Sequence, residues 1–230
     1  VPHELQVVYE DDLMLIVNKP SGMLSQKASE SDISLNESIL SYLIHEGLLS
    51  EETYAVFHPS VANRLDRNTS GIVLAGKTLA GQQFLSDILR DRSAKKIYHC
   101  IVRGKVEEEM HLKGYLLKDE RSNQVQIFSD ETQDAKPIET AYRPLVVGPD
   151  ATLLEVHLIT GRSHQIRAHL ASIGHPIAGD PKYGDMVWNK KLRQDFSVRS
   201  QLLHAYSITL PDGRTFIADE PEIFSQIMRG

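Results

Sequence analysis

The sequence has little cysteine and no long hydrophobic run, and each absence excludes classes of protein. Cys100 is the single cysteine among 230 residues, which excludes an internal disulfide and a thiolate zinc cluster. The longest apolar runs, such as 13–17 and 72–75, are far shorter than the ~20 residues that a membrane-spanning helix needs. The first residues also lack the basic-then-apolar pattern of a signal peptide. We therefore expect a cytoplasmic protein that does not contact membranes.

The sequence also lacks a low-complexity tract, an internal repeat and a linker rich in Pro, Gly or Ser. Its hydrophobic content of 41% is enough for a real core. Apolar spacing predicts an α+β fold on a mixed sheet. The expected strands are 5–9, 13–18, 71–77, 95–102, 124–128, 140–147, 153–159 and 203–210. Helical spacing over 34–49 predicts a helix that ends near Gly47, and two further helices are expected over 79–92 and over 163–173, the last with Ser163 as its N-cap.

Positive charge is scarce overall, because 25 basic and 31 acidic residues give a net charge of −6. It is also unevenly distributed, since residues 61–106 hold nine basic and three acidic side chains. Residues 161–230 hold nine basic and seven acidic ones. These two segments would form a positive cleft if the fold brought them together. Ordinary solvated helix faces are the alternative, and charge alone favours that alternative.

Two motifs with possible chemistry are rejected on context. Residues 71–78 match the phosphate-binding pattern G-x-x-x-x-G-K-T, but the interior Ile-Val-Leu-Ala is itself a strand and no buried strand precedes it. Binding of ATP or GTP therefore remains only as a minor hypothesis. His164 and His169 are five residues apart and do not share a helix face, so we expect no metal site.

The stretch from Asn63 to Gly71 is the most informative part of the chain. Extended backbone would place Arg64 and Asp66 on one side and Leu65 on the other, before a turn formed by Asn-Thr-Ser-Gly. A carboxylate between two arginines should be ionised at neutral pH, which suits a nucleophile or an electrostatic stabiliser. A surface aspartate with ordinary ion pairs is the alternative for so short a motif.

Five ordered segments of this chain resemble the RluA-type pseudouridine synthases. The residues that carry this resemblance are Val17–Met23, Arg64–Gly71, Lys95–Tyr98, Thr160–His169 and Gly174–Asp180 followed by Tyr183-Gly184. The resemblance implies the pseudouridine synthase fold, in which a mixed, mostly antiparallel sheet is flanked by helices and loops and has a central cleft. It also implies isomerisation of uridine to pseudouridine in RNA without any cofactor or metal.

The resemblance assigns roles to individual residues. Asp66 corresponds to the essential aspartate, acting either as a nucleophile or as a stabiliser of positive charge. Arg167 corresponds to the arginine that pairs with it, and Tyr98 to the tyrosine that stacks on uracil and assists removal of the C5 proton. Arg64 corresponds to the residue that fills the space left by the flipped base. Further expected RNA contacts are Lys19, Lys96, Arg162 and His164, although Lys19 has a structural role as its alternative.

The chain departs from the family at Asn63, where the pattern usually has histidine. A catalytically silent RNA-binding module of the same fold is therefore the alternative function. Many relatives begin with a small RNA-binding domain, whereas in this chain the first expected strand begins at residue 5. We therefore expect residues 1–230 to be one catalytic domain without that N-terminal domain, whether absent or removed. Ribosomal RNA is the expected substrate, transfer RNA is the alternative, and we expect a monomer.

Overall fold

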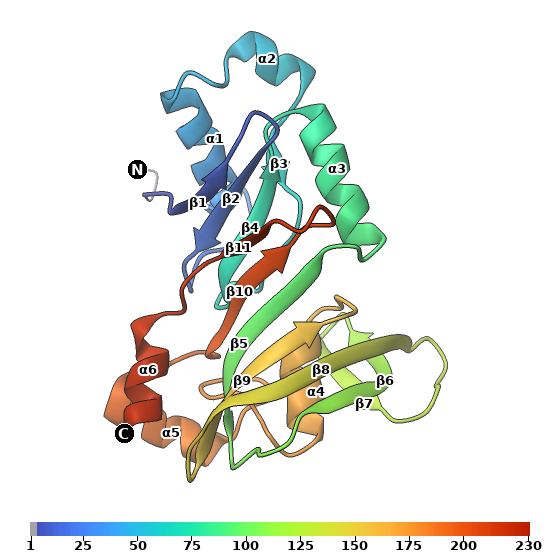
Figure 1. The fold of residues 1–230 in the computed structure, drawn as a ribbon, viewed down its shortest axis with the longest axis vertical. Helices are drawn as coiled ribbons and strands as arrows, with labels where there is room; N and C mark the ends of the chain where they lie inside the picture. Colours follow the sequence, from blue (N-terminus) through green and yellow to red (C-terminus); the bar gives the residue numbers. More distant parts are fainter. Residues whose placement is uncertain (1–3) are drawn as a thin grey trace. The chain divides into compact units, whose positions relative to one another are not determined.

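The computed structural model describes residues 4–230, which form two compact units (Figure 1). The first unit comprises residues 4–94 and Ala205–Asp219, and the second comprises Lys95–His204 and Glu220–Gly230. The chain passes from the second unit back to the first within strand β10 (Leu203–Thr209). The expectation of one catalytic domain stays a prediction, since two compact units can belong to one domain.

The first unit is a sheet with three helices. Its strands are neighbours in the order β1–β2–β4–β10, with β3 beside β4 and β11 beside β10. The pairs β1–β2, β2–β4, β3–β4 and β10–β11 are antiparallel. The elements are β1 (Val7–Glu10), β2 (Met14–Lys19), α1 (Leu35–His45), α2 (Glu51–Val56), β3 (Ser60–Val61), β4 (Ser70–Gly76), α3 (Leu79–Arg90), β10 (Leu203–Thr209) and β11 (Thr215–Ile217).

Local sequence explains where the helices of this unit begin. Ser34 caps α1 in a capping box with Glu37, and Thr78 caps α3 by accepting a hydrogen bond from the Gly81 N–H. Every residue of β4 is buried, as expected for a continuous apolar run in the middle of a sheet. The rejected phosphate-binding pattern is thus a buried strand, and Lys77 at its end bonds the Glu10 carboxylate at 2.8 Å.

The second unit is a fully antiparallel sheet with helices on both faces. Its strands are neighbours in the order β5–β9–β8–β6–β7. The elements are β5 (Lys95–Arg103), β6 (Met110–Asp119), β7 (Gln124–Phe128), β8 (Lys136–Val147), β9 (Ala151–Leu158), α4 (Gln165–Ser172), α5 (Met186–Phe196) and α6 (Glu222–Arg229).

Strand alternation divides the core of the second unit between the two faces of its sheet. On one face, Ala168 of α4 packs against Ile138, Leu116 and Val125 of the strands. On the other face, the paired residues Ile101 and Leu153 pack against side chains of α5 and α6. The register places Tyr98 opposite Val156, and Val156 opposite Tyr142, on the face that carries α4. The α+β class and the mostly antiparallel sheet are therefore confirmed.

Two sequence-based expectations need correction, and a third is confirmed. The helix expected from Ser163 begins at Gln165, because His164 adopts a left-handed conformation with φ of 54° and cannot continue a helix backwards. The segment 62–66 forms a loop rather than a strand, although Leu65 is buried as the alternation predicts. The expected end of the first helix near Gly47 is confirmed, because α1 ends at His45 and Gly47 follows with φ of 70°.

Candidate active site

Asp66 lies in the loop that precedes β4 in the first unit. Its backbone carbonyl accepts a hydrogen bond from the Thr69 N–H at 3.0 Å, which closes the turn predicted from Asn-Thr-Ser-Gly. The preceding residue, Leu65, is anchored through its N–H and C=O to the Ser25 hydroxyl, both at 3.0 Å. Buried Leu65 therefore fixes the loop, while Arg64 beside it is exposed.

Lys19 holds this loop in place through hydrogen bonds to backbone carbonyls. Its ammonium group donates hydrogen bonds to the carbonyl oxygens of Pro20 at 3.1 Å, Met23 at 2.6 Å and Arg67 at 2.9 Å. Burial lowers the pKa of Lys19 to about 8, and the nearby negative charge of Asp66 opposes that shift. The side chain has no exposed surface, which favours the structural alternative for Lys19, while the phosphate contact stays a prediction.

Asn63, at the position of the family histidine, joins the loop to β4. Its side-chain oxygen accepts a hydrogen bond from the Leu74 N–H at 2.7 Å, and its amide donates to the Ile72 carbonyl at 3.3 Å. The carboxamide thus imitates a neighbouring strand by offering one donor and one acceptor to the backbone. A local structural role accounts for asparagine at this position.

Tyr98 and Lys96 occupy β5 in the second unit, on the sheet face that carries α4. Tyr98 is mostly buried, with 8% of its surface exposed. Lys96 is half-buried, and its ammonium lies 3.1 Å from the point where a Cβ on Gly161 would stand. The predicted alternation of Lys96 and Tyr98 against Ile97 is therefore present. Lys96 also sits beside the turn that leads to α4.

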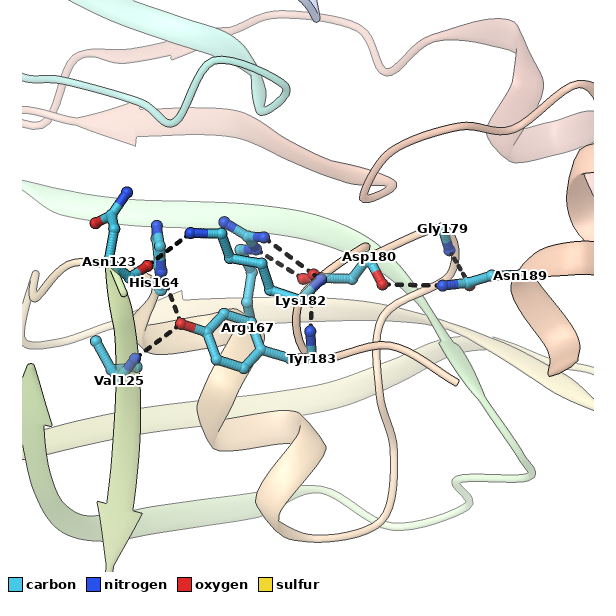
Figure 2. Close-up of polar contacts among 9 residues, drawn as sticks. All are labelled: Asn123, Val125, His164, Arg167, Gly179, Asp180, Lys182, Tyr183 and Asn189. Carbon is cyan, nitrogen blue, oxygen red and sulfur yellow. Dashed lines mark hydrogen bonds and ion pairs between the residues drawn. The ribbon is translucent and has the colours of Figure 1, made fainter. Parts of the chain in front are cut away.

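Arg167, on the first turns of α4, forms a buried bidentate ion pair with Asp180 (Figure 2). Its Nε donates to Asp180 Oδ2 at 2.7 Å and its Nη2 donates to Oδ1 at 3.0 Å. Both side chains are almost entirely buried. Asp180 lies in the motif Gly-Asp-x-x-Tyr-Gly, and this pattern is the sequence signal for Asp180, although it predicts no partner for the carboxylate.

Tyr183 links Arg167 to His164. The guanidinium carbon of Arg167 lies 5.2 Å from the centre of the Tyr183 ring, and the Tyr183 hydroxyl is 2.7 Å from His164 Nδ1. The same hydroxyl accepts a hydrogen bond from the Val125 N–H at 3.0 Å. His164 and Arg167 therefore both contact Tyr183 (Figure 2). Arg162, which precedes α4, is exposed.

The predicted site residues are divided between the two units. Asp66, Arg64 and Lys19 belong to the first unit, and the second unit holds Tyr98, Lys96, Arg162, His164 and Arg167. Among residues 4–230, no three His, Cys, Asp or Glu side chains are grouped in a way that could hold a metal ion. Within the same range, no helix is both long and apolar enough to cross a membrane.

Known proteins resemble this chain in sequence over most of its length. Ribosomal large subunit pseudouridine synthase C of Haemophilus ducreyi is 37% identical over 213 residues, which cover 92% of this chain and 63% of that protein. The tRNA pseudouridine synthase C of Vibrio cholerae is 34% identical over 212 residues, which cover 87% of this chain and 83% of that protein. The chain thus spans less than two thirds of the length of the first relative.

Solved structures resemble it in fold. Human RNA Pseudouridylate Synthase Domain Containing 4 aligns with a TM-score of 0.77 at 19% identity, covering 97% of this chain and 92% of that one. The second human protein of this kind, Domain Containing 1, aligns with a TM-score of 0.72. At such low identity these matches concern the fold alone.

The decisive match is to the RNA pseudouridylate synthase family, over residues 13–172. That range contains the Asp66, Tyr98 and Arg167 motifs and covers more than half of the sequence. Together with the two relatives above 30% identity, it confirms the resemblance that the motifs predict. This chain belongs to the RNA pseudouridylate synthase family.

Proposed function

We propose that this protein isomerises uridine to pseudouridine in RNA. The family match over residues 13–172 carries the proposal, because it includes the loop of Asp66, the strand of Tyr98 and the helix of Arg167. In this reaction the N1–C1′ bond breaks, the uracil turns, and a C5–C1′ bond forms. The proton leaves C5 and N1 gains one, so the reaction needs neither an oxidant nor a second substrate.

We propose Asp66, Tyr98 and Arg167 as the catalytic residues. A carboxylate such as that of Asp66 can attack as a nucleophile or stabilise the positive charge that develops on the ribose. An aromatic ring at Tyr98 can stack on the uracil, and its hydroxyl can assist transfer of the C5 proton. The guanidinium of Arg167 can orient and neutralise the carboxylate.

We propose that the exposed or half-exposed cations bind the RNA. Arg64 and Arg162 are exposed and Lys96 is half-buried, so each can reach a phosphate or a base. His164 contacts the Tyr183 ring, on which Arg167 also lies. The relatives are named for ribosomal RNA and for transfer RNA, so both are candidate substrates. We also propose that the protein works in the cytoplasm and acts as a monomer.

Tritium release from RNA labelled at uridine C5 tests this proposal. The wild type should release tritium from ribosomal or transfer RNA, and the RNA that responds identifies the substrate class. Asp66→Asn removes the charge without changing the volume, so it should abolish release while RNA affinity and thermal unfolding stay close to wild type. Binding of RNA without tritium release by the wild type would instead support the silent RNA-binding module.

A further inference from the structure

The ion pair of Arg167 and Asp180 fixes the plane of the guanidinium. Two parallel hydrogen bonds, from Nε and from Nη2, engage both oxygens of the carboxylate. A single bond would allow the guanidinium to rotate about that bond, whereas two bonds to one carboxylate do not. The remaining edge of the Arg167 guanidinium, which includes Nη1, therefore has a fixed orientation.

A contribution to the stability of the fold does not by itself explain the buried ion pair of Arg167 and Asp180. Asp180 has no exposed surface and Arg167 has 4% exposed. Removing two charges from water costs several kcal/mol each, and well-packed apolar residues of similar volume often stabilise a protein equally well. A buried pair of this kind is better explained by the geometry that it imposes on the arginine.

Asp180 is itself rigidly held, so it can act as a reference point for Arg167. Its Oδ1 also accepts hydrogen bonds from the N–H groups of Lys182 at 2.8 Å and Tyr183 at 3.1 Å. Its backbone carbonyl accepts from the Asn189 side chain at 2.9 Å, and that same side chain accepts from the Gly179 N–H at 2.8 Å. The loop that carries Asp180 is thereby fastened to α5.

The charge of Arg167 and the burial of the side chain shift the pKa of the Asp180 carboxylate in opposite directions. Burial favours the neutral form, but the hydrogen bonds and positive charge of Arg167, with the two backbone N–H groups, outweigh it and hold the pKa of Asp180 below its usual value. Asp180 is therefore ionised at neutral pH. The Tyr183 ring adds a second support, because it lies against the guanidinium and is anchored to Val125 of β7.

We propose that Asp180 is a positioning residue for the isomerisation, holding the Arg167 guanidinium in its catalytic orientation. This inference rests on the proposed function, since it gives Arg167 a task in the reaction. Asp180 has no exposed surface and does not touch the RNA. We expect its effect on the rate of isomerisation to pass through Arg167, and a double-variant cycle tests this expectation.

The experiment measures the single-turnover rate of tritium release at saturating RNA, together with RNA affinity. Asp180→Asn should lower the rate by about 100-fold, because small misplacements of a catalytic group cost rate by this order. Its Kd for RNA should stay within about threefold of wild type, since no binding group is removed. In an Arg167→Met background, Asp180→Asn should cause no further loss of rate.

Two further variants keep the test interpretable. Asp185→Asn is the matched control, because Asp185 is a carboxylate of the same loop region whose partner, Arg103, is half-exposed. It should leave the rate unchanged. Asp180→Glu retains the charge but shifts its position, so it should fold even if Asp180→Asn does not. We expect it to lose about tenfold in rate with unchanged RNA affinity.

Several results would contradict the inference while leaving the proposed function intact. One is a folded Asp180→Asn or Asp180→Glu variant that releases tritium at the wild-type rate. Another is an additional loss when Asp180→Asn is combined with Arg167→Met, since Asp180 would then act by another route. A wild-type protein that releases no tritium would contradict the proposed function, and the inference with it.

Discussion

At the scale of single residues, Lys19 has an unusual environment for a charged group. It has no exposed surface, and three backbone carbonyls surround its ammonium. One of these carbonyls belongs to Arg67, the residue next to Asp66. Lys19 therefore ties the turn after β2 to the loop of the proposed catalytic aspartate, and it places a positive charge near that carboxylate.

Lys19→Met should weaken both the fold and the activity. It leaves three carbonyl oxygens without their shared donor, so we expect the free energy of unfolding to fall by about 2–3 kcal/mol. It also removes a positive charge near Asp66 and loosens its loop, so tritium release should slow by more than about tenfold at saturating RNA. Urea unfolding and single-turnover rates measure the two effects.

Lys27→Met is the matched control, because Lys27 is exposed in the same N-terminal segment. Its unfolding midpoint should equal that of the wild type. If Lys19→Met were as stable and as active as Lys27→Met, the three hydrogen bonds of Lys19 would have no role in holding the loop.

The residue types at the site could be predicted, whereas their surroundings could not. Sequence motifs pointed to Asp66, Tyr98 and Arg167 because family resemblance is carried by local patterns. They could not reveal that Lys19 is buried or that Asn63 bonds the backbone of β4. The same limit applied to Asp180, whose partner lies 13 residues earlier along the chain.

At the scale of secondary-structure elements, Gly71 is a point where β4 lies very close to the backbone of another strand. It pairs with Lys19 across the β2–β4 ladder and has φ of 114°. A Cβ built there would stand 2.3 Å from the carbonyl oxygen of Ala205 on β10. Only glycine allows this approach, which occurs directly after the Asp66 loop.

Gly71→Ala should therefore destabilise the protein by more than about 3 kcal/mol, because backbone strain and a clash with backbone atoms add together. Gly213→Ala separates the two causes. Gly213 also has positive φ, of 90°, but no atom lies within 4 Å of its added Cβ. We expect the control to lose only about 1–2 kcal/mol in thermal or urea unfolding. Equal losses at the two sites would contradict the close approach of β10.

Elements with strong periodicity could be predicted from the sequence, and weakly patterned ones could not. β4, β5 and β9 follow continuous or alternating apolar residues, and α1 has a clear N-cap. By contrast, α5 buries only Leu192 and leaves its apolar residues Met186 and Val187 exposed, so its apolar residues do not mark a single buried face. The start of α4 depends on the left-handed conformation of His164, which is a minority conformation even for histidine and is therefore not predicted from the sequence.

At the scale of the whole molecule, a net charge of −6 has to be reconciled with a polyanionic substrate. The chain carries its positive charge in two segments, and the proposed RNA contacts Arg64, Lys96 and Arg162 come from both of them. Local contacts with phosphates can drive binding even though the molecule as a whole is acidic. The sequence could predict these segments, but the assignment of Arg64 and Lys96 to different units needed the structure.

RNA affinity should therefore fall steeply as salt increases, in spite of the negative net charge. Each phosphate contact contributes about 0.7 to the slope of log Kd against log salt for single-stranded RNA. Three contacts predict a slope of about 2, so a rise from about 50 to about 200 mM salt should weaken binding by roughly 20-fold. Fluorescence anisotropy with a labelled RNA fragment at four salt concentrations measures this slope.

Arg162→Gln should reduce the slope by about 0.7, because it removes one phosphate partner without removing a catalytic group. Arg121→Gln is the matched control, since Arg121 is an exposed arginine at the turn between β6 and β7 and is not among the proposed contacts. It should leave the slope unchanged. A wild-type affinity that did not vary with salt would show that the basic segments do not bind phosphates. A slope altered equally by both substitutions would mean that overall charge, rather than a defined contact at Arg162, attracts the RNA.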